Sequence, residues 1–342
     1  MLQNLQPKVA IVILNYNTKP LLARFLPAVE ATSYQNKEIW VVDNASKDGS
    51  AKFVYDNFQD INLLETQENL GYAGGYNWAL NQIEADYFVL LNSDVLVTPS
   101  WINSLVALAL SNPNIAAIQP KILDFKNKEL FEYAGASGGF LDKWGYAFCR
   151  GRIFDVLEKD SGQYNTVEQV FWATGACLFV DAKAYQESGG LDADFFAHME
   201  EIDLCWRLQK MGKLIYVQPQ SEVYHIGGGT LTEGSDRKYF LNFRNNLVMM
   251  VKNHTGLWLP VLLWRMVLDG VSAIKFVLDG KPSIFVQLIK SHLAFWGSLK
   301  STLTKRKEIK AKWKSKVMLY PKSIVWQHFA KKVKHYSQLE TS

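Results

Sequence analysis

Residues 89–95 read VLLNSDV, and this stretch decides the fold. A run of apolar residues predicts a strand buried on both faces, and Asn92, Ser93 and Asp94 follow at its end. An aspartate at a strand end is also common in ordinary turns, so Asp94 by itself does not indicate a site. The interpretation depends on how the neighbouring strands end.

Three earlier segments predict strands that alternate with helices. Apolar runs at 9–14 (VAIVIL), 38–42 (EIWVV) and 61–65 (INLLE) have the length and composition of strands. Helical patterns at 18–33, 47–58 and 74–83 follow them, the first with Thr18 as its expected N-cap. Strands and helices alternating at this spacing predict βαβ units and a parallel sheet.

Polar side chains collect where these strands end. They are Asn15, Asn17, Asp43, Asn69, Asn92 and Asp94. Ligands of open α/β sheets bind outside the carboxyl ends of the strands, so these groups are expected to share one crevice. Asp43 can accept hydrogen bonds from a base or a ribose. Residues 68–77 (ENLGYAGGYN) add amides and glycines, among them Gly71 and Asn77, but lack the spacing of a GxGxxG turn or a P-loop.

A nucleotide diphosphate in this crevice would require a divalent cation, because its charges cannot be desolvated unpaired. Mg²⁺ or Mn²⁺ prefers oxygen ligands and takes one or two protein carboxylates, a role that suits Asp94. His225 follows a predicted strand and precedes three glycines, so it is a second candidate ligand. A purely structural role for His225 is equally consistent with the sequence.

Later in the chain, residues 195–212 (FFAHMEEIDLCWRLQKMG) predict a loop followed by a helix that ends at Gly212. Glu200, Glu201 and Asp203 lie at the start of this helix, where acids also complement the helix dipole. The apolar residues before them favour a drier pocket, which would raise a carboxyl pKa and suit a general base. Residues 112–168 predict mixed strands and loops, and 170–180 and 215–217 predict further strands.

The bulk composition is that of a globular protein of about two domains. The 342 residues carry a net charge of +4, but 12 basic and two acidic residues after 299 give that tail +10 and leave −6 on the remainder. A basic tail on an acidic body indicates an anionic partner surface. The three cysteines, Cys149, Cys177 and Cys205, fit reduced thiols, and the first apolar run is too short for a signal peptide.

From residue 257 the sequence predicts amphipathic helices. A narrow polar stripe runs down the first one, through Arg265, Asp269, Ser272, Lys275 and Asp279. Residues 284–299 repeat the pattern, and neither segment has the ~18 uninterrupted apolar residues of a membrane span. Such helices followed by basic residues are typical of an in-plane membrane anchor. Packing on the main domain or on a second subunit is the alternative.

Taken together, seven motifs resemble the family 2 glycosyltransferases, and most closely the bacterial rhamnosyltransferase-like branch. They are VILNYN, VVDNAS, ENLGYAGGYN, LLNSDV, TGAC, FFAHMEEIDLCWRL and VYHIGGGT, and the similarity covers residues 8–253. The resemblance implies a GT-A fold: a Rossmann-like, mixed α/β sheet in residues 1–253, here with an amphipathic, basic, helical extension at 254–342. It also implies inverting transfer from a nucleotide-diphosphate sugar, with dTDP-rhamnose as first expectation and a UDP-hexose as second.

The resemblance also assigns roles. Asp43 matches the family's nucleotide-binding acid, and Asn17, Asn69, Gly71, Asn77 and Asn92 are expected around the nucleotide. Asp94 and His225 match the metal- and diphosphate-binding positions. Glu201 matches the catalytic base, with Glu200 as a rival. The acceptor is expected to be a lipid-linked glycan or a polysaccharide, and the protein is expected in the cytoplasm, peripheral on the inner face of the cell membrane.

Two departures from the family pattern keep other functions open. Asn92 stands where the family's first metal-site acid is expected, so an inactive sugar-nucleotide-binding partner subunit remains an alternative. Glu201 replaces the commoner aspartate. A sugar-nucleotide pyrophosphorylase is less consistent, because NYNTKP after the first strand lacks the glycine- and arginine-rich loop that would hold a triphosphate. The basic tail comes with no motif that reads nucleic acid, so no nucleic-acid partner is expected.

Overall fold

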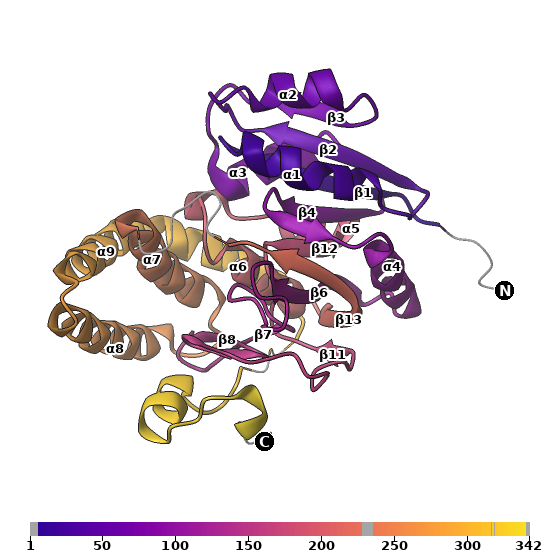
Figure 1. Ribbon diagram of the computed structural model, residues 1–342. Helices are drawn as coiled ribbons and strands as arrows, with labels where there is room; N and C mark the ends of the chain where they lie inside the picture. The colour runs from indigo at the N-terminus through magenta and orange to yellow at the C-terminus, as the bar shows by residue number, and fades with distance from the viewer. Residues whose placement is uncertain (1–5, 228–234, 316, 318, 340–342) are drawn as a thin grey trace.

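The computed structural model describes residues 6–227, 235–315, 317 and 319–339. Within them, nine strands form one mixed sheet (Figure 1), in the order β11-β13-β6-β12-β4-β1-β2-β3, with β5 paired to β13. The strands are β1 (Val9–Asn15), β2 (Lys37–Asp43), β3 (Asn62–Glu65), β4 (Tyr87–Asn92), β5 (Val95–Val97), β6 (Ile115–Asp124), β11 (Glu168–Gln169), β12 (Cys177–Asp181) and β13 (Leu214–His225). The predicted parallel order is confirmed for β1–β4, and β12 lies antiparallel to β4 and β6.

Helices cover both faces of this sheet. They are α1 (Lys19–Glu30), α2 (Ser50–Asn57), α3 (Gly71–Leu80), α4 (Trp101–Ser111), α5 (Ala182–Ser188) and α6 (Glu200–Lys210). Because side chains alternate along a strand, Ile11 and Ile13 of β1 pack with α1 and α4, while Ala10 and Val12 pack with α3, α5 and α6. Burial on both faces explains why β1 is a continuous apolar run.

Two predictions about strands differ from the structure. The strand predicted at 170–180 begins only at Cys177. Before it the chain turns at Gly175, whose carbonyl accepts a 2.6 Å hydrogen bond from the hydroxyl of Tyr72. A Cβ on Gly175 would lie 2.8 Å from that hydroxyl, so the predicted close approach at Gly175 is made by a tyrosine of the protein itself. The two strands predicted near 215 and 223 are one strand, β13, with an irregularity between Gln218 and Glu222.

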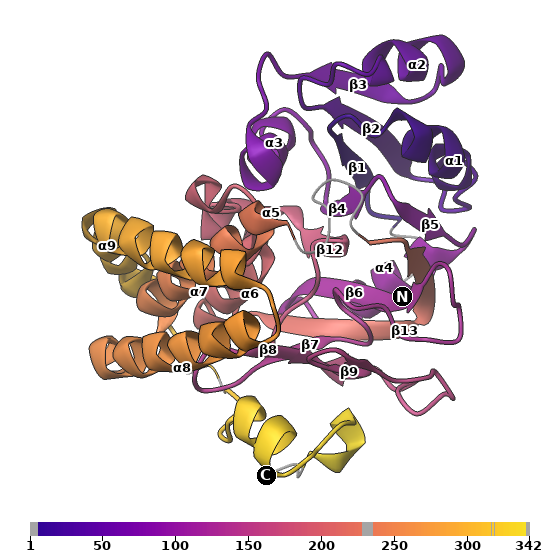
Figure 2. The ribbon, with the colours of Figure 1, turned by 60° about the vertical axis from the view of Figure 1, so that its left-hand side comes forward.

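A small antiparallel sheet lies beside the main one (Figure 2). It consists of β7 (Gly139–Leu141), β8 (Ala147–Cys149), β9 (Arg152–Ile153) and β10 (Val156–Leu157). The C-terminal segment contains short helical turns at Trp326–Ala330 and Tyr336–Gln338. Its Ile324 and Leu339 pack against Phe148 and Ile153 of the small sheet. The three cysteines are buried and unpaired, as expected.

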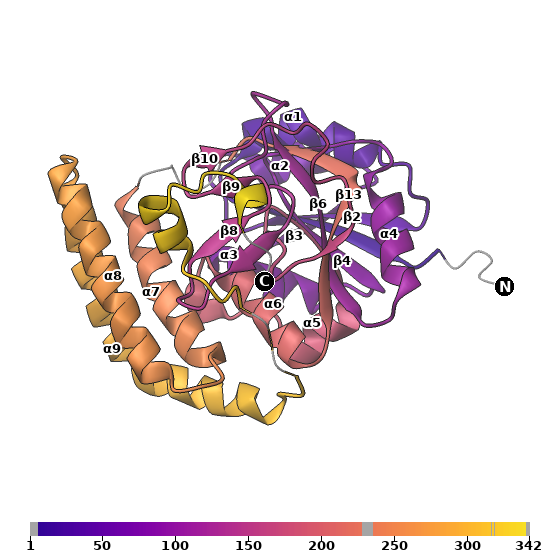
Figure 3. The same ribbon diagram turned by 90° about the horizontal axis from the view of Figure 1, so that it is seen from below.

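Three helices complete the chain: α7 (Asp236–Asn253), α8 (Trp258–Leu278) and α9 (Pro282–Ala311). Figure 3 shows α7 between α8 and the main sheet. The predicted polar stripe of α8 is turned inward at two positions, because Arg265 and Asp269 are buried and paired at 2.8 Å. The guanidinium of Arg265 also lies over the ring of Tyr146.

The outer faces of α8 and α9 are apolar and exposed. They carry Leu259, Leu263, Trp264, Val267, Val271, Ile274, Val277, Leu278, Phe285, Val286, Ile289, Leu293 and Trp296. We call this set the outer face of α8–α9. Among the described residues, no helix combines the length and hydropathy that a bilayer crossing requires.

Candidate functional site

A cavity of about 270 Å³ opens at the carboxyl end of β4, next to the end of β13 and the start of α6. Six of the residues predicted from sequence line it: Asn69, Gly71, Asn92, Asp94, Glu201 and His225. They come from segments more than 150 positions apart in the chain. Tertiary folding therefore brings the acidic strand end, the acidic helix start and the histidine to one place.

Asp94 and His225 face each other at the base of this cavity. The Asp94 Oδ1 and His225 Nε2 atoms lie 3.1 Å apart, and His225 Nδ1 lies 3.1 Å from Glu132 Oε1. All three side chains are buried. Burial lowers the pKa of His225, but Glu132 and Asp94 outweigh it and raise that pKa to about 10. The histidine is thus held between two carboxylates.

The donor atoms fit a divalent cation that is shared with a phosphate ligand. Asp94 offers a carboxylate oxygen, which Mg²⁺ and Mn²⁺ prefer, and His225 offers an imidazole nitrogen once it has lost the proton that Asp94 and Glu132 favour. The described part of the chain contains no group of three or more His, Cys, Asp or Glu side chains placed to hold a metal ion. The two residues therefore fit a cation whose remaining ligands are phosphate oxygens and water.

Glu200 and Glu201 begin α6 and line the same cavity. The Oε2 atoms of both are buried and find no hydrogen-bond partner among the described residues. Burial raises the pKa of Glu201 to about 7, against backbone hydrogen bonds that lower it. Burial and the neighbouring Glu201 raise the pKa of Glu200 well above its usual range. One carboxyl is thus suited to exchange protons near neutral pH, and the other to stay neutral.

The loop before α6 holds an unusual backbone conformation. Phe196, His198 and Met199 have φ angles of 64°, 70° and 73°, a left-handed region that non-glycine residues seldom adopt. The side-chain amide of Asn245 in α7 lies 2.8–3.0 Å from the carbonyl oxygens of residues 195, 197 and 198. Asn245 therefore fixes the turn that aims Glu200 and Glu201 into the cavity.

The helix α3 begins at Gly71, three residues earlier than the sequence predicted. The φ of +72° at Gly71 and the ring of Phe196, which a Cβ would approach to 2.5 Å, leave room only for glycine. Asn69 precedes it and accepts hydrogen bonds from Gly71 N (2.8 Å) and from the amide of Asn44 (3.0 Å). This wall of the cavity is therefore fixed by contacts within the protein.

Three predicted site residues do not line the cavity. The buried carboxylate of Asp43 accepts hydrogen bonds from Asn15 Nδ2 (2.9 Å) and Ser46 N (2.8 Å). Asn17 is exposed, and its side-chain oxygen accepts from Lys47 N at 2.7 Å. Asn77 lies farther along α3, where its amide donates to Leu191 O and accepts from Leu191 N.

Other lining residues were missed by sequence reasoning: Tyr16, Tyr72, Glu132, His198, Arg237 and Lys238. Glu132 lies in the segment 112–168, which had no clear pattern. Arg237 and Lys238 open α7 directly after a glycine-rich segment, and that pair of cations was a signal that could have been used. Gly228 and Gly229 of the predicted glycine loop lie outside the described residues.

The amino-acid sequence was compared with known protein families and with characterised proteins. Residues 10–169 match the family model described as Glycosyl transferase family 2. The chain is a glycosyltransferase, and its residues 10–169 are similar to family 2. It is 24% identical over 271 residues to the N-acetylglucosaminyl-diphospho-decaprenol L-rhamnosyltransferase of Mycobacterium tuberculosis, covering 75% of this chain and 88% of that protein.

Solved structures show the fold of this glycosyltransferase. A structure of GalNAc-T7 with UDP, GalNAc and Mn²⁺ superposes with a TM-score of 0.58 at 14% identity, over 72% of this chain and 48% of the other. The mannosyltransferase PcManGT from Pyrobaculum calidifontis, in complex with GDP-Man and Mn²⁺, gives 0.51 at 17% identity, over 90% and 86%. The fold is that of the GT-A glycosyltransferases, as the sequence predicted.

Proposed function

We propose that this glycosyltransferase transfers a sugar, with inversion, from a nucleotide-diphosphate donor to a hydroxyl of a lipid-linked glycan. One observation carries the proposal: the carboxylate of Glu201 opens into the same cavity as Asp94 and His225. A single displacement requires a base on the acceptor side and a place for the departing diphosphate on the other. The residues that line this one cavity can supply both.

Glu201 acts as the base in this proposal. It accepts the proton of the acceptor hydroxyl while that oxygen bonds to the anomeric carbon, whose bond to the diphosphate oxygen breaks. A pKa near 7 suits a group that must be ionised to start and protonated to finish. Glu200 stays protonated beside it, because two adjacent buried carboxylates cannot both ionise at little cost.

The diphosphate lies toward Asp94 and His225, with Arg237 and Lys238 as further cationic contacts. Asp94 and His225 would hold a divalent cation, Mg²⁺ or Mn²⁺, which when bound supplies positive charge to offset that of the diphosphate. The Mn²⁺ in both structural neighbours supports this assignment. Glu132 Oε1 lies 3.1 Å from the other ring nitrogen of His225, and this ion-pair contact helps to orient the ring.

The nucleoside extends from this cavity toward the ends of β1 and β2. Asp43 and Asn17 lie there and are proposed to contact the base or ribose, and Asn92, Asn69 and Gly71 border the path between. Asn77 contributes by holding the loop at Leu191 in place. The donor is dTDP-rhamnose first and a UDP-hexose second, since the mycobacterial relative is named as an L-rhamnosyltransferase and a neighbour binds UDP.

The lipid-linked acceptor is supported by that relative's name and by the surface of this protein. An exposed apolar face of this extent is rare on a soluble monomer and marks an interaction surface. The outer face of α8–α9 is proposed to lie in the interfacial layer of the inner membrane leaflet, with the basic residues of the following segment near lipid headgroups. This arrangement would bring the cavity close to a polyprenyl-linked acceptor.

A donor screen tests the proposed reaction. The purified chain is incubated with dTDP-rhamnose, UDP-hexoses and GDP-mannose, with Mg²⁺ or Mn²⁺, and nucleotide diphosphate release is measured with and without a polyprenyl-diphosphate-linked N-acetylglucosamine. We expect acceptor-dependent release with dTDP-rhamnose. Acceptor-independent release alone, or no release with any donor, would count against the proposal.

Vesicle flotation tests the membrane contact. Val271 is 61% exposed on α8, and V271E should reduce flotation with anionic vesicles at least tenfold because it places a charge in the apolar face. Val167 is 42% exposed away from these helices, so V167E is the matched control and should float like the native chain. If the native chain does not bind vesicles but is a dimer in light scattering, and V271E dissociates that dimer, the face belongs to an interface with a second copy instead.

A further inference from the structure

A second cavity, of about 350 Å³, lies at the other end of α6. Its walls are the C-terminal end of α6, the C-terminal end of α9 and the loop at 188–193. Glu200 at the start of α6 lines the candidate active site, and Lys210 at its end lines this second cavity. Ten residues of helix separate the two, or roughly 15 Å, so they are distinct sites.

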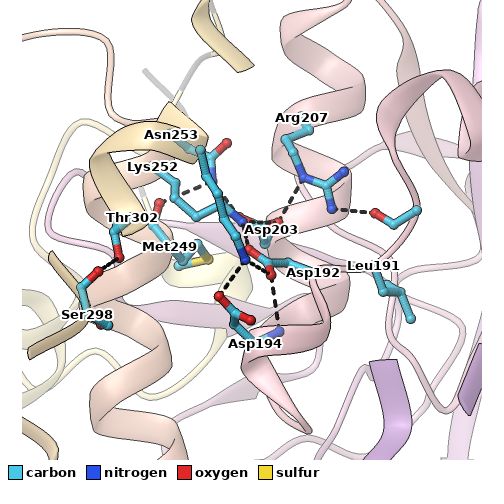
Figure 4. Close-up of polar contacts among 12 residues, drawn as sticks. Leu191, Asp192, Asp194, Asp203, Arg207, Met249, Lys252, Asn253, Ser298 and Thr302 are labelled. Atoms are coloured by element: carbon cyan, nitrogen blue, oxygen red, sulfur yellow. Dashed lines mark hydrogen bonds and ion pairs between the residues drawn. The ribbon is translucent and has the colours of Figure 1, made fainter. Parts of the chain in front are cut away.

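Basic side chains dominate the lining of this cavity. They are Arg207, Lys210, Lys252, Lys305 and Lys312, against the two acids Asp192 and Glu308. Figure 4 shows how some of these are neutralised: Arg207 pairs with Asp203 at 2.8 Å, and Lys252 contacts both Asp192 and Asp203. Lys305 pairs with Asp192 and Asp194. The charge of these three residues is therefore used within the protein.

Lys210 is different, because its ammonium has no acidic or carbonyl partner among the described residues. The residue is only 1% exposed, yet no hydrogen bond or ion pair joins its Nζ atom to any of residues 6–227, 235–315, 317 and 319–339. Its described neighbours are the ring of Trp313, 4.6 Å from Nζ, and the guanidinium of Arg306. Burial and Arg306 lower the pKa of Lys210 to about 8, which leaves the group mostly charged at neutral pH.

A buried, unpaired ammonium is costly to keep unless something in the site compensates it. The fold provides carboxylates to Lys252, which lines the same cavity, and the described residues provide none to Lys210. The two acids in the lining do not fill this role: Asp192 is shared by two lysines, and Glu308 is exposed. The cavity in front of Lys210 is the place that remains for a counter-charge.

We propose that this cavity is an anion site for a phosphate group, held by Lys210 with Lys312 at the rim. A phosphate presents several acceptor oxygens and can contact two ammonium groups at once. Lys312 is exposed and donates only to a backbone carbonyl, that of Glu187, so it is free to reorient. The phosphate can come from a lipid headgroup or from a free phosphate compound. The assignment does not depend on the sugar donor.

Binding of inorganic phosphate and pyrophosphate to the full-length chain tests the site. In calorimetric titration, the native protein should bind the anion. K210M should bind it at least tenfold more weakly, whereas the dissociation constant of K210R, which keeps the charge, should stay within about threefold of the native value. K238M removes a cation of the candidate active site and should leave this binding intact. If K238M abolishes the heat and K210M does not, the anion belongs to the active site and the proposal is wrong.

A second arm identifies the source of the phosphate. Vesicles of phosphatidylglycerol in phosphatidylcholine are compared with phosphatidylcholine alone. A headgroup ligand predicts that K210M weakens flotation with the anionic vesicles, and a free ligand predicts loss only in the calorimetric arm. Equal binding by native protein and K210M in both arms would overturn the proposal. If K210M does not fold, K312A at the exposed rim provides the same comparison.

Discussion

Glu201 and Asp203 lie two residues apart at the start of one helix, yet the structure gives them opposite surroundings. Asp203 is 0% exposed and its oxygens are met by Arg207 (2.8 Å), Lys252 (3.0 Å) and the amide of Asn253 (2.7 Å). Glu201 is partly buried and has an oxygen with no described partner. A buried acid with partners stabilises the fold, whereas a buried acid without them has a raised pKa and is available for chemistry.

The backbone shows the same contrast. Asp203 is inside a regular helix, and the residues before Glu200 have left-handed φ angles that need Asn245 to hold them. Strain of this kind persists where the surrounding structure over-determines it, and it clusters at functional sites. The comparison therefore separates a stabilising region of the helix from the region proposed to be reactive, and four measurements can break or sharpen it.

The largest effect is expected for E201Q. The amide cannot accept the acceptor proton, so kcat should fall about 10³-fold, within the range for loss of a general base. Nucleotide binding, measured by calorimetry, should be unchanged. E200Q is the matched control and should stay within a few fold of native turnover, because an amide resembles the protonated carboxyl. The reverse ranking of the two variants would make Glu200 the base.

D203A should act on stability instead of chemistry. Removing one partner leaves Lys252 and Arg207 short of a counter-charge, at a cost of about 3–5 kcal/mol in the free energy of unfolding. Urea denaturation measures this. D194A removes an exposed acid of the same network and should cost under about 1 kcal/mol. If D203A is as stable as D194A, Asp203 does not stabilise the fold in the way proposed.

N245A tests the turn between the two regions. It leaves three carbonyl groups without their described donor, and we expect a loss of about 2 kcal/mol in stability. Because the carboxyls of α6 then lose their fixed position, kcat should fall about tenfold in the folded fraction. N242A, on the same helix and bonded only to the preceding turn, should change neither quantity appreciably.

The pH dependence gives the smallest effect. A base with a pKa of about 7 must be ionised, so kcat should rise about tenfold from pH 6 to pH 8 and then level off. The residual activity of E201Q should lack this rise. A native profile that is flat between pH 6 and pH 8, or that falls, would be inconsistent with Glu201 as the titrating base.

Sequence reasoning predicted the strands of the first half well, because β1 and β4 are buried on both faces and appear as unbroken apolar runs. It predicted too long a strand before Cys177, since the packing of Tyr72 on Gly175 is a contact between distant segments. It found the helices α8 and α9 but not the inward direction of Arg265 and Asp269, which depends on Tyr146 and on each other.

For the candidate site, residues at strand ends could be found because parallel strands deliver their ends to one edge. Glu132 could not, since its position beside His225 follows from the path of an irregular segment. The sequence also could not show that Lys210 lacks an acidic partner among the described residues, because a lysine that forms an ion pair and one that does not look alike in a sequence.

The sequence by itself determined the alternating core, the order of the acidic motifs and hence the family. Local hydrophobic patterns and short-range spacing are properties of neighbouring residues, and they survive without any knowledge of packing. Only the tertiary structure decided which of three clustered acids is neutralised, which lysine lacks a partner and which face of α8 points outward. Those outcomes depend on charges and surfaces brought together from distant parts of the chain, and burial sets their energies.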